Sequence, residues 1–211
     1  IASGPNLEAN LLVVSKYIDK SKKLGANIIV LPENFAMISK DDSMYLGIKE
    51  ELGSGRIQYH ISSEARKHNV WIIAGTIPIT SQKEGKVYSC CIVFNNKGVI
   101  VSSYNKIHLF DVNIVETNEK YRESDYFQNG DSVVYVDTPF CRIGLAVCYD
   151  LRFPELFRKL SNENIDLICM PAAFTSFTGK AHWQHLIKAR AIENLVYFAA
   201  SAQGGYHVSG R

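Results

Sequence analysis

Helix-like and strand-like patterns of hydrophobic residues alternate near the amino end of the chain. After Gly4-Pro5, apolar residues recur every three or four positions up to Ile18, and Gly25 ends the stretch. Proline at the start and glycine after the end are typical of a helix, so we predict an amphipathic helix here. The continuous apolar run 27–31, closed by Pro32, predicts a strand that is buried on both faces.

The rest of the chain continues this alternation, but hairpins interrupt it. The patterns predict further helices over 55–68, 154–160 and 181–194, and further strands over 70–75, 165–170 and 196–202. Turn-forming residues join two pairs of β-rich runs into predicted antiparallel hairpins, 87–94 with 99–103 and 133–136 with 142–147. We therefore expect a mixed-sheet α/β fold in which two sheets pack face to face, with helices outside.

Composition narrows the class of protein. With 46% hydrophobic and 21% charged residues, the chain is not intrinsically disordered. Its 23 Lys and Arg against 21 Asp and Glu give a net charge of +2, so no field of one sign favours nucleic acid or an anionic membrane as a partner. The longest apolar runs fall far short of the roughly 20 residues that span a bilayer.

The five cysteines indicate a reducing compartment. Their number is odd and four of them lie inside apolar strand-like runs, which fits free thiols better than a disulfide framework. We therefore expect a cytoplasmic protein. No Cys-x-x-Cys pair or His/Cys cluster has the spacing of a zinc site, and His182 and His185, one helical turn apart, lack a third ligand. We expect no metal.

Two charged residues at strand ends are candidates for chemistry. Glu33 follows the first predicted strand, at the kind of edge where ligands of layered α/β folds collect. The alternative is a solvated loop glutamate. Lys106 lies among bulky apolar and aromatic residues, where partial desolvation would lower its pKa. The alternative is a lysine whose ammonium reaches solvent from a half-buried strand.

A cysteine at a strand end is the third candidate. Cys148 ends the strand-like run 142–148 and shares a face with the small residues Gly144 and Ala146. A turn follows, and a helix is predicted after Pro154. Unpaired backbone N–H groups and the positive end of a helix would lower the pKa of such a thiol and would supply donors to an oxyanion. The alternative is a buried structural cysteine.

Together, these three side chains divide the labour of acyl transfer. A thiolate is a strong nucleophile once it has lost its proton. A carboxylate can take that proton and return it to a leaving amine, and a fixed cation can hold the charge of the tetrahedral intermediate. The three residues are far apart along the chain, so composition and spacing do not show whether they meet.

Three segments, in order along the chain, resemble a known family. Residues 31–34 (LPEN), 104–110 (YNKIHLF) and 144–155 (GLAVCYDLRFPE) resemble the glutamate, lysine and cysteine segments of the carbon–nitrogen hydrolase (nitrilase) superfamily. The resemblance covers nearly the whole chain. It implies a four-layer αββα sandwich with mixed β-sheets, a homodimer or higher homo-oligomer, and a single domain over 1–211 that is incomplete at both ends.

The resemblance also implies roles for the candidate residues. Glu33 would be the general base, Lys106 would stabilise the oxyanion, and Cys148 would be the nucleophile. The backbone N–H of Tyr149 would share the oxyanion hole. The family requires no metal or organic cofactor for this chemistry.

A second glutamate follows the lysine segment in many family members. Residues 121–124 (YRES) resemble that second segment, which makes Glu123 the candidate for orienting the catalytic groups. Glu119 is the competing choice and ranks lower.

Two further stretches suggest the type of substrate. Residues 172–183 and 190–194 resemble the branch of omega-amidases and deaminated-glutathione amidases. The implied activity is hydrolysis of a small-molecule amide through a cysteine thioester, releasing ammonia or an amine and a carboxylic acid. One alternative is an N-carbamoyl amino acid hydrolase or a nitrilase with the same triad. An alternative of another class is a catalytically silent binding protein.

Three residues are candidates for contact with the substrate. Arg152, four residues after Cys148, would either pair with a substrate carboxylate or form a salt bridge that holds the turn. Phe174 and Thr175 follow a predicted strand and would line the pocket. The segment 111–129 is predicted to be a long loop that covers the site.

Overall fold

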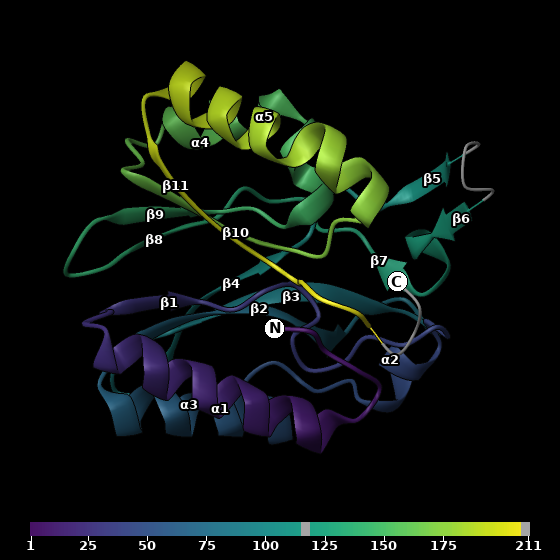
Figure 1. Cartoon of the computed structure of the whole chain (residues 1–211), viewed down its shortest axis with the longest axis horizontal. Coiled ribbons are helices and arrows are strands. Elements are labelled where there is room, and N and C mark those ends of the chain that lie inside the picture. Colours follow the sequence, from purple (N-terminus) through teal and green to yellow (C-terminus); the bar gives the residue numbers. More distant parts are fainter. Residues whose placement is uncertain (115–118, 208–211) are drawn as a thin grey trace.

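Two β-sheets lie face to face between two layers of helices (Figure 1). The computed structural model describes residues 1–114 and 119–207. Its layer order confirms the four-layer αββα sandwich with mixed sheets that the sequence predicts. Within the described ranges, every helix is too short or too polar to span a membrane.

The first sheet contains strands from the first two thirds of the chain. Its order is β1-β2-β3-β4, and β7 also pairs with β3. β1 is parallel to β2, whereas β3 is antiparallel to β2 and β4, so the first predicted hairpin is confirmed. Helices α1 and α3 cover its outer face (Figure 1). The elements are α1 (Leu7–Lys23), β1 (Ile28–Val30), α3 (Arg56–His68), β2 (Trp71–Thr80), β3 (Val87–Phe94), β4 (Ile100–Asn105) and β7 (Phe127–Gln128).

The second sheet contains the carboxyl-terminal strands and also mixes directions. Its order is β11-β10-β9-β8, with β9, β10 and β11 parallel and β8 antiparallel to β9, as the second predicted hairpin requires. Helices α4 and α5 cover its outer face (Figure 1). The elements are β8 (Tyr135–Asp137), β9 (Arg142–Leu145), α4 (Pro154–Ser161), β10 (Leu167–Ala172), α5 (Ser176–Asn194) and β11 (Tyr197–Ala202).

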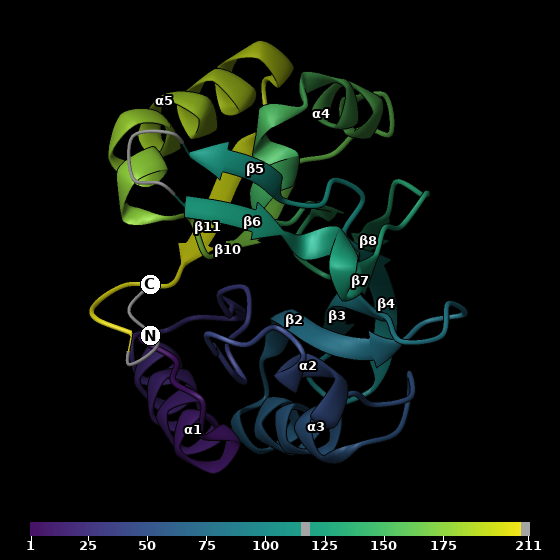
Figure 2. The same cartoon turned by 90° about the vertical axis from the view of Figure 1, so that its right-hand side faces the viewer.

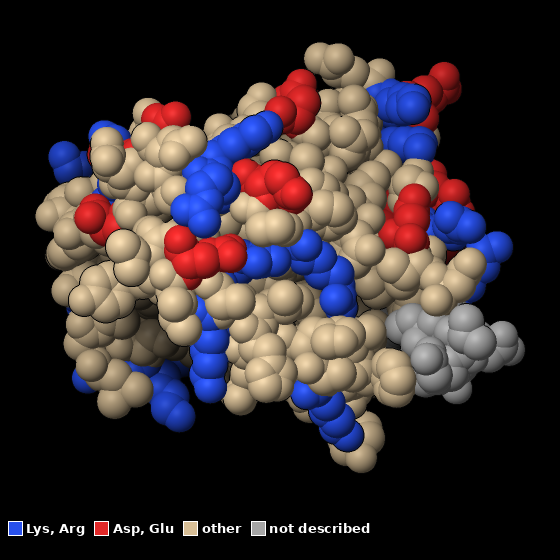
Figure 3. All heavy atoms as spheres, turned by 90° about the horizontal axis from the view of Figure 1, so that it is seen from above, with Lys and Arg blue, Asp and Glu red and all other residues tan. Residues whose placement is uncertain are grey.

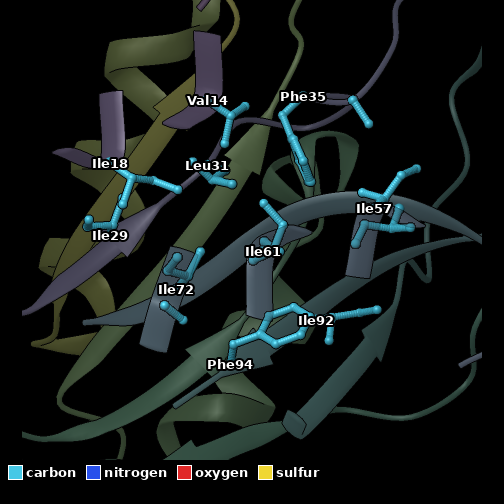
Figure 4. Packing of buried hydrophobic residues seen from close by; sticks show 14 of the residues in the cluster. Val14, Ile18, Ile29, Leu31, Phe35, Ile57, Ile61, Ile72, Ile92 and Phe94 are labelled. Carbon is cyan, nitrogen blue, oxygen red and sulfur yellow. The ribbon is translucent and has the colours of Figure 1, made fainter. Parts of the chain in front are cut away.

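Side chains of β2 and β3 alternate between two hydrophobic cores. Ile72 and Ile92 point toward α1 and α3, where they pack in one cluster with Val14 and other apolar residues (Figure 4). Ile73 and Val93 point the other way and pack against the second sheet. Because both faces are covered, these strands are continuous apolar runs rather than alternating ones.

The segment 111–129 is not the long loop that the sequence predicts. β5 (Asp111–Ile114) and β6 (Glu119–Arg122) form an antiparallel hairpin, and the 3₁₀ helix η1 (Glu123–Asp125) follows. The hairpin stands at one end of the sandwich and pairs with neither large sheet (Figures 1 and 2). Its strands are short and rich in polar residues, so they carry no hydrophobic period that could reveal them.

Some element bounds also differ from the prediction. Helix α5 begins at Ser176, five residues before the predicted start, because the Thr175 side chain accepts a hydrogen bond from Thr178 N (3.3 Å) and caps it. Strand β2 continues to Thr80, where it still pairs with β3. The short helix α2 (Met44–Gly47) was not predicted.

Charges of both signs are mixed on the face that α4 and α5 form. Lys and Arg side chains lie next to Asp and Glu across this surface (Figure 3). On α5, the buried Arg190 side chain also pairs with Glu193, with 3.0 Å between Nη1 and Oε1. This face therefore presents no field of one sign that would favour nucleic acid.

Candidate active site

Glu33 lies three residues after the end of β1, in a turn that packs against β2. Its side chain is buried, and the next residue, Asn34, has a left-handed backbone with φ of 56°. Asn34 N donates to Thr76 Oγ1 on β2 (3.0 Å). Gly75 permits this close approach, because a Cβ at that position would lie 1.8 Å from Pro32 O. The turn therefore fixes the direction in which the carboxylate points.

Lys106 follows β4 and is held at both its backbone and its side chain. Its N donates to Ser89 O (3.0 Å), and its O accepts from Gly130 N (2.8 Å). The side chain is 2% exposed, and its ammonium donates to Glu33 Oε1 (2.9 Å) and to both Glu123 oxygens (3.0 and 2.9 Å). The ammonium therefore contacts three carboxylate oxygens, which belong to two glutamates.

Glu123 stands at the base of the β5–β6 hairpin. Phe110 N donates to Glu123 Oε2 (2.6 Å), and Glu123 N donates to Phe110 O (3.4 Å). The two ends of the hairpin therefore meet at this residue and fix its carboxylate on Lys106. The side chain of the competing candidate, Glu119, lies outside the part of the chain that is described.

Cys148 occupies a sharp turn rather than a strand. β9 ends at Leu145, and Cys148 begins the 3₁₀ helix η2 (Cys148–Arg152) with a left-handed φ of 45°. Such a backbone is strained for a residue other than glycine. The turn places the sulfur in the same cluster as Leu145 and Val147, whereas Ala146 packs against α4. The prediction that the thiol shares a face with the small residues is therefore wrong.

Burial and nearby charges set the protonation of the site, and two predictions from the sequence are wrong here. Burial alone would lower the pKa of Lys106, but Glu123 and Glu33 raise it well above its usual range. Burial raises the pKa of the Cys148 thiol well above its usual range, and the hydrogen-bonded Glu33 carboxylate raises it further. Burial also raises the pKa of Glu123. A raised thiol pKa favours the protonated sulfur over the thiolate.

A cavity of about 740 Å³ opens onto these side chains. That volume lies within the range of roughly 300–1,000 Å³ for small-molecule sites. Its lining contains all seven side chains predicted for the site, namely Glu33, Lys106, Glu123, Cys148, Arg152, Phe174 and Thr175. The structure therefore brings together residues from both sheets and from the hairpin.

Arg152 borders this cavity with no carboxylate partner among the described residues. Its guanidinium carbon lies 5.8 Å from the centre of the Tyr149 ring and 5.5 Å from that of Phe174. Its two terminal nitrogens each lie 3.3 Å from His182 Nδ1. The structure thus shows no salt bridge through which Arg152 would hold the turn, in the ranges that it covers.

The whole chain matches one family. The sequence model of carbon-nitrogen hydrolases aligns with residues 2–211. The chain belongs to the carbon–nitrogen hydrolase family. It is 38% identical to the deaminated glutathione amidase of Yersinia enterocolitica over 208 residues, which cover 98% of this chain and 72% of that relative. The human deaminated glutathione amidase is 35% identical over 210 residues, which cover 98% of this chain and 64% of the relative.

Solved structures agree with this assignment. Saccharomyces cerevisiae Nit3, a member of branch 10 of the nitrilase superfamily, has a TM-score of 0.84 at 29% identity and covers 96% of this chain and 72% of its own. The C. elegans NitFhit protein has a TM-score of 0.84 at 32% identity and covers 99% of this chain and 52% of its own. The predicted family is confirmed. The chain is an amidase-type enzyme of a family that hydrolyses carbon–nitrogen bonds through a cysteine.

Two residues of this carbon–nitrogen hydrolase were not predicted to serve the site. Gln203 Nε2 donates to Glu33 O (3.0 Å) across 170 positions of sequence, and no local pattern could reveal such a contact. Asp150 is fully buried and accepts from Val147 N (2.8 Å). An acidic residue two positions after the cysteine, among apolar residues, was the available signal. Among the described residues, no group of three His, Cys, Asp or Glu could hold a metal ion.

Proposed function

We propose that this carbon–nitrogen hydrolase cleaves small amides that carry a carboxylate. Its relatives are named deaminated glutathione amidases, and that name supports a substrate of this kind. One observation carries the proposal. The Lys106 ammonium lies between two buried carboxylates, in the cavity onto which the Cys148 thiol opens. This arrangement offers a nucleophile, a base and a fixed cation at one place.

Acylation uses Glu33 as the base. Its carboxylate takes the proton of the Cys148 thiol, and the sulfur attacks the amide carbon to form a tetrahedral intermediate. The Lys106 ammonium and the Tyr149 N–H stabilise the oxyanion, and each such donor contributes on the order of 3 kcal/mol. Glu33 then gives its proton to the departing nitrogen, the carbon–nitrogen bond breaks, and a thioester remains on Cys148.

Deacylation repeats the cycle with water. Glu33 removes a proton from a water molecule as that water attacks the thioester carbon. The second oxyanion uses the same two donors, Lys106 and Tyr149 N–H. When the carbon–sulfur bond breaks, the proton returns from Glu33 to Cys148, and the carboxylic acid leaves. Glu123 holds Lys106 in place through both steps by its two contacts with the ammonium.

Arg152 supports the carboxylate in the proposed substrate. A guanidinium pairs well with a carboxylate through two parallel hydrogen bonds. Arg152 borders the cavity between two aromatic rings and has no carboxylate partner among the described residues, so an anionic substrate group can meet it there. Phe174 and Thr175 form part of the same wall and would contact the body of the substrate.

We also infer a single domain over 1–211, a cytoplasmic location and assembly into a homodimer or a larger homo-oligomer. The five free cysteines support a reducing compartment. Family resemblance is the support for the oligomer. Light scattering from the purified chain would show a mass at least twice that of one chain, and a mass equal to one chain would contradict the assembly.

The test of the proposed function is a substrate panel with trapping of the intermediate. Purified enzyme is offered carboxylate-bearing amides, neutral amides of the same length, N-carbamoyl amino acids and nitriles, and release of ammonia or amine is measured. We expect fastest turnover of the carboxylate-bearing amides, an acyl adduct on Cys148 in quenched samples, and no turnover by Cys148→Ala.

A matched control and two contrary results complete the test. Cys141→Ala removes a half-buried thiol that does not line the cavity, and it should leave turnover unchanged. Faster turnover of N-carbamoyl compounds or nitriles would replace the proposed substrate class by that alternative. Turnover by Cys148→Ala at the parental rate, or none by the parent on the whole panel, would refute the nucleophile or favour the silent binding protein.

A further inference from the structure

One buried carboxylate joins the segment that carries Lys106 to the segment that carries Cys148. Asp150 is fully buried and accepts four hydrogen bonds. Its Oδ2 accepts from Tyr104 Oη (2.7 Å) and Val147 N (2.8 Å). Its Oδ1 accepts from His108 N (3.0 Å) and His108 Nδ1 (2.6 Å).

The donors to Asp150 lie next to the two candidate catalytic residues in the sequence. Tyr104 and His108 lie two residues before and two residues after Lys106, while Val147 directly precedes Cys148. Asp150 therefore receives bonds from both sides of the lysine and from the residue before the nucleophile. The His108 ring also stacks on Phe153, with 3.7 Å between ring centres, so the lysine segment meets the turn a second time.

Asp150 lies outside the cavity that the candidate reactive groups line. It is not among the residues that line the cavity, and neither are Tyr104 and His108. A buried carboxylate is costly unless donors surround it, and here four donors occupy its two oxygens. An apolar side chain could fill the same space, but it could not fix the lysine segment relative to the cysteine segment by hydrogen bonds.

We propose that Asp150 is a positioning residue that sets where the Lys106 ammonium stands relative to the Cys148 sulfur. The proposal rests on the proposed function, because the lysine and the cysteine must act on one reacting carbonyl. Displacing a catalytic group by about 1 Å can cost a factor of about 100 in rate. Loss of Asp150 should therefore impair thiolate formation and acylation more than it impairs binding.

The experiment measures Asp150→Asn by two readouts. The first is the rate at which iodoacetamide alkylates Cys148 between pH 6 and 9, resolved from the other cysteines by mass spectrometry. The second is kcat and KM for succinamate, a short amide that carries a carboxylate. We expect about tenfold slower alkylation at pH 7, a profile moved to higher pH, and about 10- to 100-fold lower kcat with KM within threefold of the parent.

Two further variants keep the proposal open to refutation. Tyr104→Phe removes a single donor and should change the same quantities in the same direction by about three- to tenfold, even if Asp150→Asn folds poorly. Asp166→Asn is the matched control, because Asp166 also accepts from a backbone N–H (Arg142 N, 2.8 Å) but is exposed at the far end of β9. Its alkylation rate and kcat should equal those of the parent.

The results that would overturn the positioning role differ from those that would overturn the proposed function. Parental alkylation and kcat in both Asp150→Asn and Tyr104→Phe would overturn it. So would faster alkylation of Cys148 together with the buried Cys90 and Cys169, since that marks general loosening. Alkylation needs no turnover, so the positioning role is tested even if the parent does not cleave succinamate.

Discussion

Replacing Glu33 by glutamine removes one charge from the site and keeps the size of the side chain. The Lys106 ammonium makes three contacts with carboxylate oxygens, and only one of them, at 2.9 Å, goes to Glu33. The glutamine carbonyl can still accept that bond, and Glu123 remains as the counterion. A charge-assisted bond then becomes an ordinary one, which costs about 1–2 kcal/mol of stability.

The cost to catalysis should be much larger. A positioned general base contributes roughly 10²- to 10⁴-fold, which corresponds to about 3–5 kcal/mol of activation free energy. The Cys148 thiol has a raised pKa, so almost no thiolate forms without that base. We therefore expect Glu33→Gln to fold and to lose at least 100-fold in kcat/KM.

Two measurements on one protein sample separate the two effects. Urea unfolding gives the free energy of unfolding, and amine or ammonia release gives kcat/KM. Glu64→Gln is the control, because Glu64 is also a buried glutamate but lies on α3, away from the cavity. If folded Glu33→Gln retains more than a tenth of the parental kcat/KM, Glu33 is not the base.

Three further changes, two at or beside the site and one in the cores, have expected outcomes that urea unfolding can check. Gly75→Ala places a Cβ 1.8 Å from Pro32 O, so urea unfolding should show a loss of about 1–3 kcal/mol and kcat should fall as the turn moves. Burial raises the pKa of Cys90 and Cys169 from 9.0 to about 12. Because these thiols ionise at lower pH in the unfolded chain, the free energy of unfolding should fall above pH 9, by about 2 kcal/mol for each thiol at pH 10.5. In Cys90→Ala the free energy of unfolding should fall less steeply with pH. Lys106→Met leaves two buried carboxylates without a counterion and should cost about 3–5 kcal/mol at pH 7. Burial raises the folded-state pKa of Glu123, so stability should recover as pH falls toward 5, again by urea unfolding.

The sequence predicts well those helices and strands whose hydrophobic side chains are buried at a regular spacing along the chain. In β2, Ile72 and Ile73 enter opposite cores, so the strand is apolar throughout and easy to recognise. The β5–β6 hairpin buries little and carries no such period. The start of α5 depends on one hydrogen bond to the Thr175 side chain, and a pattern of hydrophobic residues carries no information about that bond.

The candidate site could be predicted residue by residue but not in its electrostatics. Glu33, Lys106 and Cys148 each follow a recognisable strand, and the family resemblance supplies Glu123. The sign of each pKa shift, in contrast, depends on which charges meet in space. Burial alone predicts a lowered Lys106 pKa, whereas the carboxylates that raise this pKa come from residues 73 and 17 positions away.

The charges of the site explain why a raised thiol pKa and a nearby base belong together. With both carboxylates ionised and the ammonium protonated, Glu33, Glu123 and Lys106 carry a combined charge of −1. Losing the Cys148 proton to solvent would take the buried cluster to −2, which its low-polarity surroundings oppose. Passing that proton to Glu33 forms the thiolate while the total stays at −1. In the proposed mechanism, the thiolate therefore forms only when Glu33 accepts its proton, and that proton is then close to the leaving nitrogen.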